Sequence, residues 1–220
     1  MKAIIIGGSM AGLFAALLLR QRGIEAVVFE RAQTELSGRG AGIATHTQIL
    51  DLIESLGLDV LPGESGWWRL IAESAVTVAL PDGHRLPASN TIHLVLSPDR
   101  PVNRWHVLES DDVHLLIEGG PVEYVLLPRA GPARREVMGH DATRGETPLV
   151  IAAAGAWTAL RLVDPSGYAW IVTTVTPAWT ADRARIGLDA AVRERVVGTQ
   201  PWLTAALLDD LDDERPRRPR

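Results

Sequence analysis

The chain opens with MKAIIIGGSMAGLFAALLLRQRG, residues 1–23, in which an apolar run, a cluster of small residues and an apolar-periodic stretch follow one another. Residues 2–6 lack polar alternation and end at two glycines, a pattern typical of a strand that is buried on both faces. Apolar side chains then recur at helical spacing as far as Leu19, and Gly23 stands where a helix end tolerates a positive φ. A second short apolar run occupies residues 25–29. Together these segments predict a strand, a helix and a strand, which is a βαβ unit with a parallel sheet.

The small residues between the first strand and the helix fit a dinucleotide-binding turn. Gly7, Ser9 and Gly12 occupy the frame G-x-G-x-x-G with serine at the middle position, and Glu30 follows Gly12 by eighteen residues. Glycines allow a tight turn and close packing, while the N–H groups at the helix start attract a diphosphate. A carboxylate at the tip of the second strand can accept hydrogen bonds from a ribose, and it would repel a 2′-phosphate. The pattern therefore favours FAD or NAD over NADP.

Two other interpretations use the same residues. Gly7, Ser9 and Ala11 come close to the G-x-S-x-G nucleophile elbow of serine hydrolases. An elbow needs an oxyanion donor from a loop after an earlier strand, and only eight residues precede Ser9, so a serine hydrolase is the remote alternative. The second alternative interpretation is a βαβ unit that binds no nucleotide.

The composition excludes several classes of protein. The chain has 220 residues, 46% of them hydrophobic, and a net charge of −5, which gives no general reason to bind nucleic acid. Cysteine is absent and no apolar stretch is long enough to span a bilayer, so we expect a cytoplasmic protein that does not enter membranes. The six histidines form no i,i+4 pair, so no metal site is predicted.

Further along the chain, hydrophobic periodicity and turn residues predict more elements. We expect helices at residues 47–56, 105–117, 158–162 and 202–211, a hairpin at 75–87 around Pro-Asp-Gly, and strands at 91–96, 123–127, 149–153 and 168–176.

Residues 30–58, ERAQTELSGRGAGIATHTQILDLIESLGL, carry a family resemblance. The string resembles the single-component FAD monooxygenases that hydroxylate aromatic rings, of the para-hydroxybenzoate and dihydroxypyridine hydroxylase type. In that family a Glu-Arg pair ends the second strand, and a Gly-x-Gly-x-Gly-Ile loop leads into a helix that closes with Leu-Gly. The resemblance implies that the diphosphate, the adenosine and the flavin side are contacted by Gly7, Ser9, Met10, Ala11, Gly12, Glu30, Arg31 and Arg39.

Two later segments resemble the same family less closely. Residues 150–161, VIAAAGAWTALR, are similar to its second flavin motif, which implies a cofactor contact at Gly155. Ala154 stands at the position of the family's aspartate, which puts the use of NAD(P)H in doubt. In NRWHVLES, Arg104 is the nearest candidate for another flavin contact. The family's third motif is missing.

The resemblance implies an α/β fold: a Rossmann-like FAD-binding βαβ domain with a parallel sheet, joined to part of a β-rich substrate domain. We expect the FAD-binding domain at 1–163, with a hairpin insertion near 75–96, the partial substrate domain at 164–211 and a disordered tail at 212–220. The implied function is hydroxylation of a small aromatic or heteroaromatic substrate with O2, FAD and NAD(P)H. The alternative is a truncated relative that binds FAD or ADP without turnover. No catalytic residue is identified, and a homodimer is one option for assembly.

Overall fold

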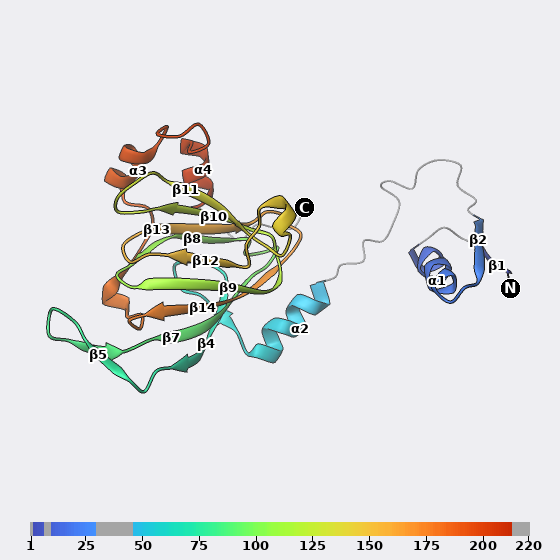
Figure 1. Cartoon of the computed structure of the whole chain (residues 1–220), viewed down its shortest axis with the longest axis horizontal. Coiled ribbons are helices and arrows are strands. Elements are labelled where there is room, and N and C mark those ends of the chain that lie inside the picture. Colours follow the sequence, from blue (N-terminus) through green and yellow to red (C-terminus); the bar gives the residue numbers. More distant parts are fainter. Residues whose placement is uncertain (1, 7–9, 30–45, 213–220) are drawn as a thin grey trace. The chain divides into compact units, whose positions relative to one another are not determined.

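A computed structural model of the chain describes residues 2–6, 10–29 and 46–212. The chain forms two compact units, residues 1–44 and residues 45–220 (Figure 1). The boundary expected between residues 163 and 164 falls inside the second unit, between two of its strands.

The first unit is a βαβ arrangement. It consists of β1 (Lys2–Ile6), α1 (Met10–Gln21) and β2 (Glu25–Phe29), and the two strands pair in parallel. Gly23 has a φ of 74°, and its N–H donates to the carbonyl of Arg20 at 3.0 Å, which ends the helix as the sequence predicts. The predicted strand, helix, strand and parallel pairing are all confirmed.

This first unit leaves much apolar surface uncovered. The exposed fraction is 67% for Ile4, 90% for Ile6 and 57% for Phe29, and three leucines of α1 are also exposed, Leu13, Leu17 and Leu18. Parallel sheets in complete α/β domains are covered on both faces by helices. The first unit is therefore a fragment of such a domain, with one helix and two strands.

The second unit is built from two antiparallel sheets. The larger has six strands in the order β12 (Leu149–Ala152), β9 (Asp111–Gly119), β14 (Ala169–Thr176), β7 (Asn90–Leu96), β4 (Trp67–Glu73) and β3 (Asp59–Val60). The smaller has five strands in the order β11 (Arg134–Met138), β10 (Val122–Leu127), β13 (Trp157–Leu162), β8 (Val102–Leu108) and β15 (Ala184–Ile186). Both sheets contribute to one buried cluster, which includes Leu94, Leu116, Tyr124, Leu160 and Ile171. The sheets thus face each other across a common core, as in double-sheet jelly rolls.

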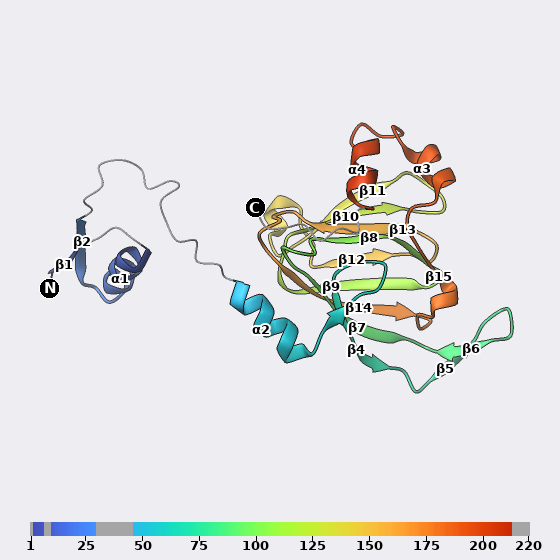
Figure 2. The same cartoon turned by 180° about the vertical axis from the view of Figure 1, so that it is seen from behind.

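Two short helices cover the outer face of the five-stranded sheet. Helices α3 (Ala190–Val196) and α4 (Ala205–Asp210) lie on that side of the barrel (Figure 2). Leu203 and Leu208 join Trp105 in a second buried cluster, and the indole Nε1 of Trp105 donates to the carbonyl of Leu208 at 3.1 Å. The three central strands of this sheet, β10, β13 and β8, are consequently buried on both faces, and every residue of β10 is buried.

Several further sequence predictions are confirmed. Helix α2 (His46–Leu56) is present, and β5 (Thr77–Ala79) pairs with β6 (Arg85–Pro87) in the expected hairpin, where Gly83 has a φ of 88°. Strands β7, β10, β12 and β14 lie where strands were predicted, whereas α4 is shorter than the helix expected at 202–211. Two 3-10 turns, η1 (Ala142–Arg144) and η2 (Ala181–Arg183), complete the second unit.

Two helix predictions are wrong. Residues 105–117 form the end of β8, a turn and most of β9, and residues 158–162 belong to β13. Strand β13 is buried on both faces, and a short, mostly apolar run of that kind does not distinguish a strand from a helix. The apolar residues between 105 and 117 belong to two strands, β8 and β9, and not to one face of a helix. The α/β fold class holds only for residues 2–29, because most of the chain is antiparallel β-structure.

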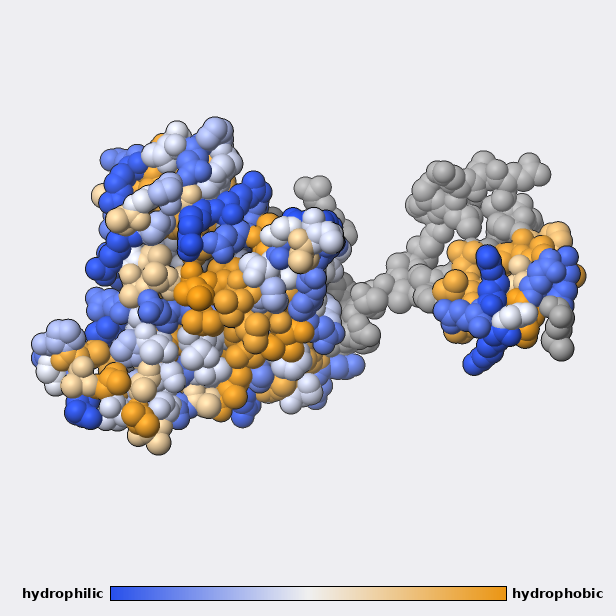
Figure 3. Space-filling model, viewed as in Figure 1, coloured by the Kyte–Doolittle hydropathy of each residue, from blue (hydrophilic) through white to orange (hydrophobic). Residues whose placement is uncertain are grey.

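The outer face of the six-stranded sheet carries an apolar patch. Figure 3 shows a hydrophobic patch in the region where Figure 1 draws β9 and β12. Exposed apolar side chains on these two strands are Leu115, Ile117, Leu149 and Ile151. Within the described residues, no helix combines the length and the apolar character that crossing a bilayer requires.

Candidate functional site

The second unit contains a cavity of about 490 Å³ between its two sheets. A volume in this range accommodates a small organic molecule. Its polar lining residues are Glu64, Glu73, Asn90, Asn103, His106, Asp112, His114 and Thr173. Its apolar wall includes Trp68, Leu70, Ile92, Leu94 and Trp179.

Strand β9 carries polar residues into this cavity. Asp112 and His114 are 5% and 2% exposed, whereas Leu115 and Ile117 on the opposite face are each 41% exposed. Side chains alternate between the two faces of a strand, and a half-buried strand normally turns its apolar face inward. Here the polar side chains of Asp112 and His114 point inward and the apolar ones point outward, so the fold buries polar groups in this part of the cavity wall.

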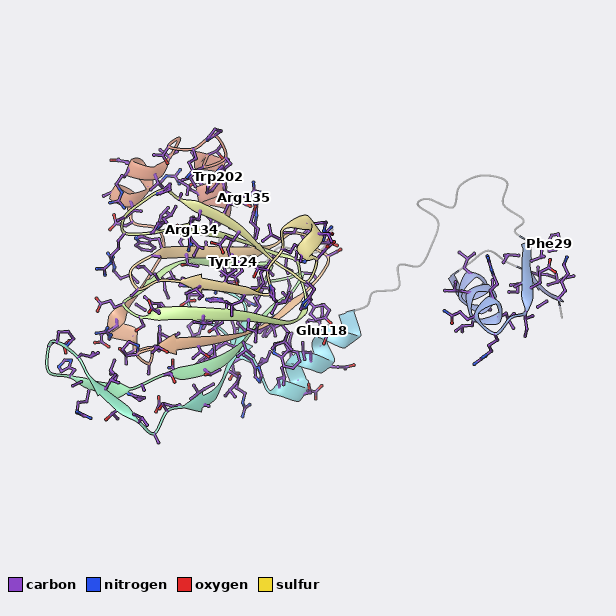
Figure 4. All side chains as sticks on the ribbon, viewed as in Figure 1. Phe29, Glu118, Tyr124, Arg134, Arg135 and Trp202 are labelled. Atoms are coloured by element: carbon purple, nitrogen blue, oxygen red, sulfur yellow. The ribbon has the colours of Figure 1, made fainter. Side chains whose placement is uncertain are left out.

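A chain of polar contacts links these residues to a tyrosine on the opposite sheet. His114 Nε2 lies 2.8 Å from Asp112 Oδ2, although the atoms are not aligned as a hydrogen bond. His114 Nδ1 lies 3.1 Å from the hydroxyl of Tyr124, a fully buried residue of β10 that Figure 4 labels among the strands of the barrel. Burial, with a smaller contribution from the charge of Asp112, raises the pKa of Tyr124 well above its usual value of 10. The phenol therefore stays protonated and can donate to His114.

One oxygen of this group has no partner. Asp112 Oδ1 is buried and accepts no hydrogen bond from any described residue. Buried carboxylate oxygens without donors are costly, so most are satisfied by protein groups, water or a ligand. Asp112 thus lines the cavity and carries one buried oxygen that has no donor among the described residues.

His106 of β8 is held from behind by the backbone. Its Nδ1 lies 2.8 Å from the carbonyl oxygen of Arg104 and 3.6 Å from Glu64 Oε2. A carbonyl only accepts hydrogen bonds, so Nδ1 carries the proton and Nε2 of the neutral ring retains its lone pair. Glu64 also lies 3.3 Å from Nδ2 of Asn103, and that amide donates to the carbonyl of Ser65 at 3.0 Å. These contacts fix the imidazole of His106 against one wall of the cavity.

The structure gives no direct indication of a metal centre. Within residues 2–6, 10–29 and 46–212, no three His, Asp or Glu side chains are arranged so that they could hold an ion.

The residues predicted from the sequence to bind a dinucleotide fall into two groups. Gly7, Ser9, Glu30, Arg31 and Arg39 lie outside the described residues. The others of the first segment, Met10, Ala11 and Gly12, form the first turn of α1, which is where the motif expects them.

Arg104 and Gly155 lie in the second unit. The guanidinium of Arg104 donates to the carbonyls of Gly63 and Asp212, each at 2.9 Å, so it ties two loops to β8. Gly155 lies in the turn before β13, with a φ of 78°, and its N–H donates to the carbonyl of Leu108 at 2.7 Å. Segment 150–161, which resembles a flavin motif, is thus β12, a turn and part of β13 of the barrel.

Sequence reasoning missed the cavity residues. The available signal was the alternation Asp112-Val113-His114-Leu115, which has the period of a strand and places one aspartate and one histidine on the same face. The i,i+4 spacing of metal-binding histidines belongs to a helix, and it does not detect an aspartate and a histidine two residues apart on a strand.

Two protein families match the chain. The family described as Cupin superfamily (DUF985) matches residues 50–186, and the family described as NAD(P)-binding Rossmann-like domain matches residues 5–73. The two matches overlap at residues 50–73, and in this overlap β4 pairs with β7 of the barrel.

Solved structures resemble the barrel. A hypothetical protein from Leishmania major has a TM-score of 0.60 and 24% identity, covering 66% of this chain and 90% of that one. A protein from Shewanella oneidensis has a TM-score of 0.59 and 18% identity, covering 77% of this chain and 97% of that one. At these identities the likeness concerns the fold.

Curated relatives match only over a short region. A 2,6-dihydroxypyridine 3-monooxygenase from Paenarthrobacter nicotinovorans is 38% identical over 56 residues, 26% of this chain and 14% of the enzyme. A FAD-dependent urate hydroxylase from Mycolicibacterium vanbaalenii is 37% identical over 84 residues, 38% of this chain and 20% of the enzyme. The chain thus spans a small part of either relative, and it carries a partial NAD(P)- or FAD-binding motif.

These findings correct the family expected from the sequence. The resemblance to aromatic hydroxylases applies to the N-terminal fragment, and it was wrong to extend it to the whole chain, because residues 50–186 match a different family and form the barrel. The chain belongs to the cupin superfamily, in the family described as Cupin superfamily (DUF985).

Proposed function

We propose that the barrel cavity binds a small organic molecule that is neutral or positively charged and donates hydrogen bonds. The observation that carries this proposal is that Asp112 lines the cavity and that its buried oxygen Oδ1 has no donor among the described residues. A ligand N–H or O–H placed there would satisfy the oxygen and recover the free energy that its burial costs.

The charges around the cavity support a ligand of this class. Glu64, Glu73 and Asp112 line it, whereas no Lys or Arg is among the described lining residues. In a partly dehydrated site the carboxylates attract an ammonium and repel a carboxylate or phosphate. The cavity should therefore discriminate by charge among ligands of the same shape.

The apolar wall supports a ring or a branched hydrocarbon as the other part of the ligand. Trp68, Leu70, Ile92 and Leu94 come from paired positions of β4 and β7, where Trp68 faces Leu94 and Leu70 faces Ile92. An apolar wall opposite a few convergent polar groups is the usual composition of a small-molecule site. The aromatic ligand that the sequence predicts is compatible with this wall and stays a prediction, as does the homodimer.

His106 is the residue we assign to proton transfer. Its Nδ1 proton is engaged by the carbonyl of Arg104, so Nε2 can accept a proton from a bound molecule. In His114, by contrast, both ring nitrogens already lie next to protein oxygens, so His114 acts by positioning Asp112. General acid–base chemistry on a ligand bound between His106 and Asp112 is the reaction type that this arrangement supports.

Three ligands that share one ring test the proposal: benzylamine, benzyl alcohol and benzoate. We expect benzylamine to bind most tightly, benzyl alcohol less tightly and benzoate not at all, as followed by ligand-observed NMR. Asp112→Asn should weaken benzylamine binding by about tenfold, because a charge-assisted hydrogen bond is lost. Glu136→Gln, which changes a carboxylate outside the cavity, should have no effect.

The proposal fails if benzoate binds as well as benzylamine or if none of the three binds. If Asp112→Asn does not fold, Glu64→Gln provides the same test from the other side of the cavity, since Glu64 also lines it.

We also propose that the N-terminal fragment binds the ADP part of a dinucleotide without turnover. The match of residues 5–73 to a NAD(P)-binding Rossmann-like domain favours this second function, as does the position of Met10–Gly12 at the start of α1. FAD is the dinucleotide that the sequence favours. Aromatic hydroxylation with NAD(P)H stays a prediction, and we favour binding alone because the segment assigned to the second flavin motif lies in the barrel. The Ser9 hydrolase remains the remote alternative.

Equilibrium dialysis of the full chain against ADP, FAD and NAD tests this second function. We expect all three to bind, since they share the ADP group, and Gly12→Val should abolish binding because a branched side chain would disturb the turn of α1. Leu18→Ala, an exposed position later in α1, is the matched control. Failure of all three nucleotides to bind would overturn the proposal.

A further inference from the structure

Four arginines line a second pocket, which lies outside the barrel cavity. A pocket of about 320 Å³ is lined by residues of β8, β13, β15 and α3 and by the turn before β13. We name it the arginine pocket after Arg129, Arg183, Arg185 and Arg195. Its acidic lining residues are Glu109 and Asp182.

Two of the arginines already have partners. Arg183 lies 3.4 Å from Glu109 Oε2 and donates to the carbonyl of Glu109 at 3.2 Å. Arg185 lies 3.7 Å from Asp189 and covers the ring of Trp157, with 5.3 Å between its guanidinium carbon and the ring centroid. The Nε of Arg183 is nevertheless buried with no acceptor among the described residues.

The other two arginines have no such partner. Within the part of the chain that the structure describes, neither Arg129 nor Arg195 forms a hydrogen bond or an ion pair. Both also line a neighbouring hollow of about 310 Å³, which adds the small apolar residues Pro132, Ala133 and Val196. Arg129 and Arg195 therefore line both the arginine pocket and the neighbouring, partly apolar pocket.

Gly155 makes room for Arg129. A Cβ atom at this glycine would lie 1.8 Å from Nε of Arg129, so any larger residue would displace the guanidinium. The backbone turn at this point seats the Arg129 side chain beside the peptide.

The charge balance at this place indicates an anionic ligand. The whole chain has a net charge of −5, yet here four guanidiniums stand against three carboxylates, Glu109 and Asp182 in the lining and Asp189 beside Arg185. Like charges at short range repel, and an anion between them relieves the repulsion. Guanidinium groups hold phosphate oxygens through two parallel hydrogen bonds, a geometry that a single ammonium cannot offer.

We propose that the arginine pocket binds the phosphate group of a small phosphomonoester, with its organic part in the adjoining hollow beside Pro132 and Val196. The ligand class is opposite in charge to that of the barrel cavity, and this proposal does not depend on the proposed function of that cavity.

Calorimetric titration of the full chain with inorganic phosphate and with phenyl phosphate tests the proposal. We expect both to bind, phenyl phosphate more tightly because of the apolar residues, and both affinities to fall as sodium chloride is raised. Arg129→Gln and Arg195→Gln should each weaken phenyl phosphate binding by about tenfold, since each removes a charge-assisted contact. Arg85→Gln, on the β5–β6 hairpin and outside the pocket, is the matched control and should leave the affinity unchanged.

Gly155→Ala offers a test that preserves every charge. The added methyl should displace Arg129 and weaken phenyl phosphate, but the positive φ of Gly155 also strains an alanine, so circular dichroism must first show a folded protein. If Gly155→Ala does not fold, Arg129→Gln and Arg195→Gln test the proposal. Absence of binding at millimolar phosphate, equal affinity in the glutamine variants, or tighter binding of benzoate than of phenyl phosphate would overturn the proposal.

Discussion

The two units of this chain differ in what holds them together. The βαβ fragment has the clearer sequence motif, yet Ile6 at the end of β1 is 90% exposed. The sequence of the barrel has weaker motifs, yet Trp105, Tyr124 and Leu160 are completely buried. A local pattern can therefore form its secondary structure without a core of its own, because a core requires further layers to pack against.

This difference suggests where stability and function are concentrated. The barrel buries apolar side chains on both sides of its five-stranded sheet and encloses the polar cavity. The fragment offers the turn of a nucleotide site but few buried contacts. Substitutions should therefore have unequal effects in the two units, and two pairs of matched variants compare them.

The largest expected effect comes from removing a buried aromatic side chain. Trp105→Ala deletes an indole that is fully buried under α4 and donates to the carbonyl of Leu208, so we expect a loss of about 3–5 kcal/mol in the free energy of unfolding. Ile4→Ala in the fragment, where the side chain is 67% exposed, should cost about 0.5 kcal/mol or less. Urea denaturation followed by circular dichroism measures both, and equal losses would contradict the contrast between the units.

A smaller effect should follow from breaking an ion-pair network. Glu123 is buried on β10 and contacts the guanidiniums of Arg135 and Arg161, and Arg161 also lies 2.6 Å from Asp210. Because those arginines are partly exposed, Glu123→Gln should cost about 2 kcal/mol, between the values for surface and fully buried pairs. The matched variant Glu25→Gln breaks the exposed Lys2–Glu25 contact at 3.1 Å and should change stability by less than about 1 kcal/mol. A Glu123→Gln protein as stable as the parent would show that this network is not needed.

The smallest effect is confined to alkaline pH. The chain has two tyrosines, and both lie in the barrel: the pKa of Tyr124 is raised well above 10, mainly by burial, and the hydrogen bond to Glu118 raises that of Tyr168 to about 12. A native pKa above the unfolded value means that folding favours the neutral phenol. This contribution is complete below about pH 10 and is lost as the pH rises through the native pKa.

Absorbance of tyrosinate measures this directly. In the folded protein neither tyrosine should ionise at pH 10, whereas in urea both should titrate near that pH. Tyr168→Phe should leave only the later titration, that of Tyr124. Ionisation of Tyr124 near pH 10 in the folded protein would mean that its site is open to water.

Part of the fold could be predicted because local patterns specify it. The βαβ elements, α2 and the hairpin at Gly83 were confirmed, since glycine positions and apolar periodicity are local signals. The helix expected at 105–117 failed because α3 and α4, from the end of the chain, bury Trp105 and Val107 on the outer face of β8, while His106 of the same strand lines the cavity. The sequence on either side of residue 105 does not show that these distant helices will cover the strand.

The candidate site shows the same division. Sequence alone determined that the chain starts with a nucleotide-type βαβ unit, because strand, turn and helix lie within thirty residues. Only the tertiary structure decided that the rest is a barrel, and it brought Glu64, His106 and Thr173 to one cavity from segments far apart in the chain. The physical reason is that pairing in antiparallel sheets joins distant segments, and a side chain becomes a site only when other strands enclose it.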